Sequence, residues 1–181
     1  MKTDTPLYQS VTLLAAVTAV ILLIPLLSMS LTNEVIWSFS DFVIAGILVF
    51  GTGLIYIAAT RKSRAVLYRL AVGLALSTAL FLVWANLAVG IIGSEDNPIN
   101  LLYFGVLGVG AIGTLSVRFR PRGMVPTLYA TALSQALVTA IALAGGFYQS
   151  PPSSVIEILA INGLFIALWV SSALLFKKAN L

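Results

Sequence analysis

The stretch FLVWANLAVGIIGSEDNPIN, residues 81–100, contains the two signals that decide the fold. It begins as an apolar run that carries Trp84 and Asn86, and it then breaks into an acidic turn with Asn97 and Pro98. Apolar runs of about 18 residues or more are typical of membrane-spanning helices. The stretch therefore predicts the outer end of one span, a short loop outside the bilayer and the start of the next span.

The composition of the whole chain agrees with this interpretation. Of its 181 residues, 60% are apolar and only 9% are charged, whereas soluble domains carry roughly 25% charged residues. The chain is therefore expected to be a single transmembrane helical-bundle domain over residues 1–181, in contact with the lipid bilayer. It has no Cys and no His, which excludes disulfides, thiolate zinc sites, histidine-ligated haem and imidazole base catalysis.

Six spans are predicted, and the charges sort between their two sides. The spans are roughly Tyr8–Ser30, Ser38–Thr60, Ala65–Ile92, Leu101–Val117, Val125–Tyr148 and Val155–Phe176. One side receives Lys2, Arg61, Lys62, Arg64, Arg118, Arg120, Arg122, Lys177 and Lys178, and the other receives Glu34, Asp41, Glu95, Asp96 and Glu157. Basic residues in short loops stay cytoplasmic. Both termini are therefore predicted to be cytoplasmic, and the net charge of +4 is explained by topology rather than by a nucleic-acid partner.

Two further features at the ends of spans each have two explanations. Arg69 lies about one turn inside the third span, where it is either a snorkelling side chain or a contact for an anion or lipid phosphate. The first span follows Lys2 and ends in Ser28-Met29-Ser30, a pattern that a signal peptide also shows. Its apolar run is longer than a usual signal core, so we expect the span to be retained.

Three stretches of the chain share a pattern that suggests an internal repeat. They are LYQSVTLLAAVTAV from Leu7, LYRLAVGLALSTAL from Leu67 and LYATALSQALVTAI from Leu128. Their spacing of about 60 residues corresponds to one helical hairpin, so the six helices would form three hairpins in a pseudo-threefold parallel repeat. Chance is the other explanation, because Leu, Ala and Thr are common in membrane spans.

Several polar and aromatic side chains lie within the predicted spans. Asn86 shares a helical face with Ala75 and Ala79, which places it toward another helix rather than toward lipid. Each such residue either holds helices together or contacts a ligand, and Trp84 is either an interfacial aromatic or the wall of a cleft. The candidates for ligand contact or pore lining are Asn86, Trp84, Asp41, Thr131, Ser134, Gln135 and Asn162.

The loops on the predicted outer side form an acidic rim of Glu34, Glu95, Asp96 and Glu157. Turn formation around Gly93 and Pro98 explains the most polar of these loops. A rim of carboxylates could alternatively bind Ca²⁺ or attract cationic solutes. Because the sequence has no spaced ligand loop, no metal site is expected.

Four segments resemble those of a family of small bacterial inner-membrane proteins of uncharacterised function. They are WSFSDFVIAG, YRLAVG, WANLAVGIIGSEDNPINLLYFGVL and FRPRGM, spread from Trp37 to Met124. The resemblance implies a multi-pass protein of the bacterial inner membrane and transfers no catalytic or binding residue.

Three functions remain compatible with the sequence. The first is a non-enzymatic accessory or scaffold subunit, with a membrane-protein partner or a second copy of the chain and no cofactor. The second is a channel or carrier for small polar solutes or cations. The third is a binder of a lipophilic cofactor such as a quinone or carotenoid, beside Trp84. An enzyme is disfavoured because no nucleophile or base occurs in a recognisable spacing.

Overall fold

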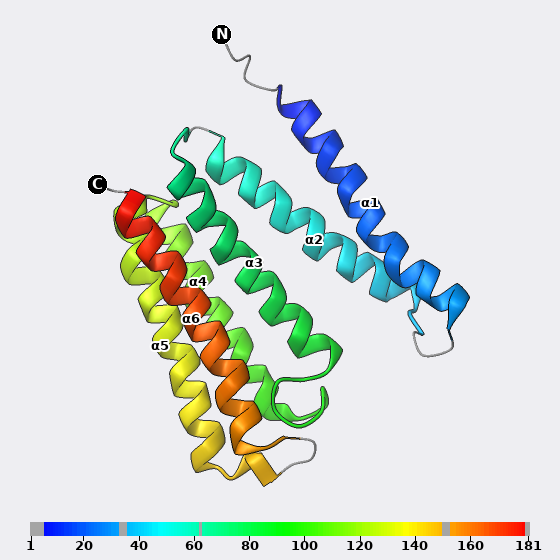
Figure 1. The fold of residues 1–181 in the computed structure, drawn as a ribbon, viewed down its shortest axis with the longest axis vertical. Coiled ribbons are helices and arrows are strands. Elements are labelled where there is room, and N and C mark those ends of the chain that lie inside the picture. Colours follow the sequence, from blue (N-terminus) through cyan, green and yellow to red (C-terminus); the bar gives the residue numbers. More distant parts are fainter. Residues whose placement is uncertain (1–5, 33–35, 62, 150–152, 180–181) are drawn as a thin grey trace. The chain divides into compact units, whose positions relative to one another are not determined.

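The computed structural model describes residues 6–32, 36–61, 63–149 and 153–179. Its helices are α1 (Leu7–Leu31), α2 (Phe39–Thr60), α3 (Val66–Ala88), α4 (Leu102–Val117), α5 (Pro121–Ala144) and α6 (Val155–Ala179), with short 3-10 helices η1 (Pro98–Leu101) and η2 (Phe147–Gln149). Figure 1 shows the six long helices, and the described residues form no strand. Each long helix, with η1 joined to α4, is long and apolar enough to cross a membrane. The predicted all-α architecture with six spanning helices is confirmed.

Two helix boundaries differ from those expected. α3 ends at Ala88 rather than at Ile92, because the chain turns there through Gly90 and Gly93, whose φ angles are 71° and 70°. Glycine adopts this left-handed region without steric cost. α5 begins at Pro121 rather than at Val125, since proline suits the first position of a helix, where its missing N–H is not needed.

The first 61 residues form a unit of their own, the α1–α2 unit. α1 packs against α2, and the Leu14 side chain of α1 lies directly over Gly53 of α2. A Cβ atom at Gly53 would clash with that leucine. Of its described residues, Thr18, Ala45 and Thr60 are buried. Helices that are apolar on every side need lipid or other helices around them, so this unit is suited to the bilayer.

The second unit, the α3–α6 unit, comprises the chain from residue 62 onward. α5 packs extensively on α6 and on α4, and α3 packs chiefly on α6. The helices therefore follow one another in space as α3, α6, α5 and α4. α3 and α4 are consecutive in the chain but touch little, so the third and fourth spans do not form a closely packed hairpin as the fifth and sixth do. The threefold repeat stays a prediction.

Glycines set the close approach of α4 and α5. A Cβ atom on Gly113 would lie 2.5 Å from Cγ2 of Thr127, and one on Gly110 would lie 3.2 Å from Oγ1 of Thr131. Both threonine hydroxyls donate to carbonyl oxygens of their own helix, at Gly123 and Thr127 respectively. These bonds satisfy the hydroxyls within α5. Small residues that allow close backbone approach are a usual basis of helix packing in membranes.

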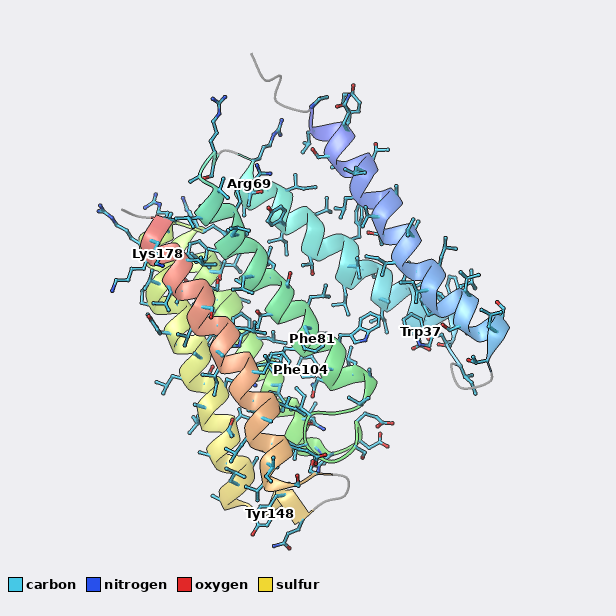
Figure 2. The ribbon with its side chains drawn as sticks, in the orientation of Figure 1. Trp37, Arg69, Phe81, Phe104, Tyr148 and Lys178 are labelled. Atoms are coloured by element: carbon cyan, nitrogen blue, oxygen red, sulfur yellow. The ribbon has the colours of Figure 1, made fainter. Side chains whose placement is uncertain are left out.

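The two ends of the α3–α6 unit carry opposite charges. Tyr68 near the start of α3 donates to the Phe119 carbonyl at 3.1 Å and packs its ring on Phe176. These contacts bring together the start of α3, the turn after α4 and the end of α6. Figure 2 shows Arg69 and Lys178 at this end and Tyr148 at the other. The described basic residues of the unit, Arg64, Arg69, Arg118, Arg120, Arg122, Lys177 and Lys178, belong to the first end, and Glu95, Asp96 and Glu157 belong to the second. This arrangement agrees with the charge-sorted threading, and its direction stays a prediction.

The direction can be tested with single cysteines, because the natural chain contains none. Ser94 and Ser116 are exposed at opposite ends of the unit. A membrane-impermeant maleimide should label Ser94→Cys in intact cells and Ser116→Cys only after permeabilisation, as basic ends stay inside. Labelling of Ser116→Cys in intact cells would reverse the threading.

Candidate functional site

Three polar side chains from three helices meet in the core of the α3–α6 unit. Oδ1 of Asn162 on α6 accepts hydrogen bonds from Nε2 of Gln135 on α5 at 2.9 Å and from the Tyr103 hydroxyl on α4 at 3.0 Å. Nδ2 of Asn162 donates to the Ile158 carbonyl at 2.9 Å, one turn back in its own helix. The side chains of all three residues are completely buried. We call this group the Tyr103–Gln135–Asn162 cluster.

The sequence of α6 explains why Asn162 points inward. Its buried residues recur at helical spacing along one stripe, which consists of Ile158, Asn162, Phe165, Trp169, Ser172, Ala173 and Phe176. Ser172 on the same stripe donates to the Ala71 carbonyl of α3 at 2.8 Å. The stripe therefore uses its polar members to bind neighbouring helices, and Asn162 faces α5 and α4.

The chemistry available to the Tyr103–Gln135–Asn162 cluster is hydrogen bonding. Two carboxamides and a phenol include neither a carboxylate nor an imidazole, and the described residues place none among their hydrogen-bond partners. General acid–base catalysis needs a group with a pKa near the working pH. The cluster can therefore join helices or hold a small polar molecule.

A second polar cluster lies at the acidic end of the unit, around Asn100. Its Oδ1 accepts from the backbone N–H groups of Ile91 and Ile92 at 3.2 and 3.0 Å. Its Nδ2 donates to the carbonyls of Ile92 and Ser94 at 3.1 and 2.8 Å. Asn86 adds a bond from Nδ2 to the Asn100 carbonyl at 3.2 Å. After α3 ends, these backbone groups have no helical partners, and the Asn100 side chain provides their hydrogen bonds instead.

Sequence reasoning did not include Asn100 among the site candidates. The signal that could have found it is the pair of glycines at positions 90 and 93 followed by Pro98, which indicates a compact turn. Buried backbone groups in such a turn must find side-chain partners. An amide placed just after the turn is the side chain that can both accept and donate.

The remaining predicted candidates do not join either cluster. Asp41 is exposed in the α1–α2 unit and completes a capping box, with Ser38 N donating to its Oδ2 at 2.7 Å. Ser134 donates to the Thr131 carbonyl at 2.8 Å, within α5. Trp84 on α3 is 36% exposed, and its two predicted roles, interfacial aromatic or wall of a cleft, both stay predictions. Of the seven predicted residues, the structure brings Gln135 and Asn162 into contact and places Asn86 in the Asn100 cluster.

The described residues of the acidic rim lie in the loop between α3 and α4 and in the first turn of α6. Glu95 and Asp96 are exposed between α3 and α4, and Glu157 is exposed in the first turn of α6, where Ser154 donates to its Oε2 at 3.1 Å. Glu34 lies outside the described residues. Within the described part of the chain, no three acidic side chains are grouped so as to hold a metal ion.

Among the described residues of the α3–α6 unit, three buried side-chain atoms have no hydrogen-bond partner: Oε1 of Gln135, Oδ1 of Asn86 and Nε1 of Trp169. Buried polar groups are rarely left unpaired, and a bound water often provides the missing bond. Two of these atoms are amide oxygens that can only accept. Each of the two can accept a hydrogen bond from a buried water.

The sequence matches no family model, no curated protein and no solved structure. The function is therefore inferred from the contacts of these side chains alone.

Proposed function

We propose that the chain is a non-enzymatic protein of a bacterial inner membrane, and that it acts as an accessory or scaffold subunit through helix contacts within the bilayer. The Tyr103–Gln135–Asn162 cluster carries this proposal. A side chain that lines a water-filled path keeps some exposure, whereas these three are completely buried and bonded to one another. Polar side chains used in this way act as connections between membrane helices.

The outer surface of α4 supports the same proposal. Gly110 and Gly113 face α5, but a Cβ atom placed on Gly105 or Gly108 would meet, within 4 Å, no atom beyond its chain neighbours and the nearby backbone of its own helix. These two glycines lie on a different face of α4, about 140° away at 100° per residue. A face of small residues lets a second membrane helix approach closely. The loops between spans are short, so the partner we propose is a transmembrane helix of another chain.

The test is co-purification from native membranes in a mild detergent, read by native mass spectrometry. The unmodified chain should carry a second chain, and Gly105→Leu with Gly108→Leu should reduce that complex by about tenfold, because the new side chains block close approach. The matched control is Ala160→Leu with Ala167→Leu, which enlarges two exposed positions of α6 and should leave the complex intact. A strictly monomeric unmodified protein, or equal loss in both double variants, would contradict the proposal.

A channel or carrier for small polar solutes is the second candidate. The unpartnered acceptors Gln135 Oε1 and Asn86 Oδ1 favour it, because a passing solute with N–H or O–H groups could bond to them. This candidate requires that water reaches Gln135, whereas the scaffold proposal requires a dry core. Thiol labelling at position 135 therefore has opposite expected results for the two candidates.

A further inference from the structure

A pocket of about 620 Å³ opens where α4 turns into α5. Its lining consists of Ser116, Val117, Arg118, Arg120, Arg122 and Gly123. Three arginines line this short turn, and each carries a planar guanidinium group with five N–H donors. We call this the arginine pocket. It lies outside both polar clusters described above.

Among the described residues of the α3–α6 unit, no carboxylate balances the positive charge of the arginine pocket. The residues that line it include no carboxylate, and Glu95, Asp96 and Glu157 lie at the other end of the unit. Among the described residues, no ion pair is formed by Arg118, Arg120 or Arg122. The pocket therefore presents three charges that an anion can neutralise.

The start of α5 adds to this positive charge. Arg120 occupies the N-cap position and Arg122 the first turn, and no side chain caps the helix. The N-terminus of a helix carries a partial positive charge, so cations are unfavourable there and anions are stabilised. Asn, Asp, Ser and Thr are the residues preferred at this place. Here the sequence provides arginines, an arrangement that an external anion would stabilise.

The turn is held in place by its neighbours. Arg118 and Phe119 adopt φ angles of 51° and 56°, a region that non-glycine residues rarely occupy. The Arg118 and Arg120 N–H groups bond back into the last turn of α4, and the Tyr68 hydroxyl of α3 bonds to the Phe119 carbonyl. These bonds support the backbone that carries the three arginines, and a preorganised site loses less entropy on binding.

We propose that the arginine pocket binds the phosphate of an anionic phospholipid headgroup. The pocket lies at the ends of two spanning helices, which is the level of the headgroups in a bilayer. Guanidinium groups match phosphate oxygens in paired hydrogen bonds. In the last turns of α4, just before the pocket lining, Ile112 and Leu115 are 68% and 72% exposed, and they offer an apolar surface for the acyl chains. Free phosphate shares the headgroup chemistry but cannot use that surface.

The experiment is a native mass spectrometry titration of the full chain in detergent with phosphatidylglycerol, phosphatidylcholine or inorganic phosphate. We expect phosphatidylglycerol to bind, and Arg120→Gln with Arg122→Gln to weaken that binding by about tenfold or more, the effect of losing at least one charge-assisted hydrogen bond. Arg122→Lys keeps the charge but loses the planar guanidinium group and its paired N–H donors, and it should weaken binding by a few-fold. The matched control is Lys177→Gln with Lys178→Gln, which removes the same charge from the same end of the unit, outside the pocket lining.

The control should bind phosphatidylglycerol within about twofold of the unmodified chain, because a general electrostatic attraction contributes little at a specific pocket. Equal losses in the arginine and lysine variants, or no loss in either, would overturn the proposal. Binding of inorganic phosphate as tight as that of phosphatidylglycerol would assign the pocket to a free anion instead of a lipid and would also overturn it.

Circular dichroism of each variant checks that the helices are retained, so a folding defect is separated from a binding defect. Complex formation through α4 is measured separately, so either proposal can fail alone.

Discussion

Replacing Asn100 with alanine is expected to lower the free energy of unfolding by about 3 kcal/mol, since unsatisfied buried polar groups cost about 1–3 kcal/mol each. The substitution removes the acceptor of the Ile91 and Ile92 N–H groups and the donor to the Ile92 and Ser94 carbonyls. Ile91 and Ile92 are themselves buried, so water cannot replace the lost bonds without opening the loop. Thermal unfolding in detergent measures the stability, and hydrogen exchange at residues 91 and 92 shows the local opening.

Asn97 provides the matched control in the same loop. Its side chain accepts one hydrogen bond, from Ile99 N at 3.2 Å, at the start of η1. Asn97→Ala should therefore cost only about 1 kcal/mol, as expected for a helix cap. Equal stability of Asn97→Ala and Asn100→Ala would mean that the Asn100 bonds do not hold the loop.

Asn162→Leu should destabilise the α3–α6 unit by at least about 2 kcal/mol. Interhelical hydrogen bonds in membranes contribute about 0.6 kcal/mol each on average and up to about 1.7, and the substitution removes two of them. It also leaves the Gln135 amide and the Tyr103 hydroxyl buried without their acceptor, which adds to the loss. Leucine shares the branched shape of asparagine but is larger, so overpacking at this buried position adds to the loss. Reversible unfolding in mixed micelles measures the change.

Tyr103→Phe serves as the control, because it removes one bond and keeps the ring. The bond from Gln135 to Asn162 remains in that variant, so a loss of under about 1 kcal/mol is expected. A double-mutant cycle between positions 135 and 162 then isolates the coupling of the two amides. Additive effects would show that the two amides do not stabilise the bundle through their mutual bond.

Membrane spans could be predicted from the sequence because length and hydropathy alone determine them. The charge pattern also predicted which helix ends lie together, and the structure gathers Arg69, Lys178 and the three arginines at one end of the α3–α6 unit. The inward face of Asn86 was predicted from its neighbours Ala75 and Ala79, and Asn86 is buried. The spans, the charges at their ends and the face of Asn86 all depend on the order of residues along the chain, so they can be predicted from the sequence.

The spatial order of the helices could not be predicted, because lipid offers no hydrophobic difference that fixes which helices pair. Contact between Gln135 and Asn162 depends on α5 lying beside α6 in one register. The role of Asn100 depends on a turn whose φ angles only the structure gives. The sequence shows that Arg118, Arg120 and Arg122 lie in one short loop between spans. It does not show that the turn is shaped so that they line a pocket.

The most direct test of the proposed scaffold role is the access of water to the Tyr103–Gln135–Asn162 cluster. The chain has no natural cysteine, so Gln135→Cys and Asn162→Cys each introduce a single thiol. A water-soluble maleimide should label both in reconstituted vesicles at least about 100-fold more slowly than Ser94→Cys, because a buried thiol is inert. Both should react fully after denaturation. Rapid labelling of positions 135 and 162 in the folded protein would show a water-filled path through the bundle and would contradict the dry, contact-forming core.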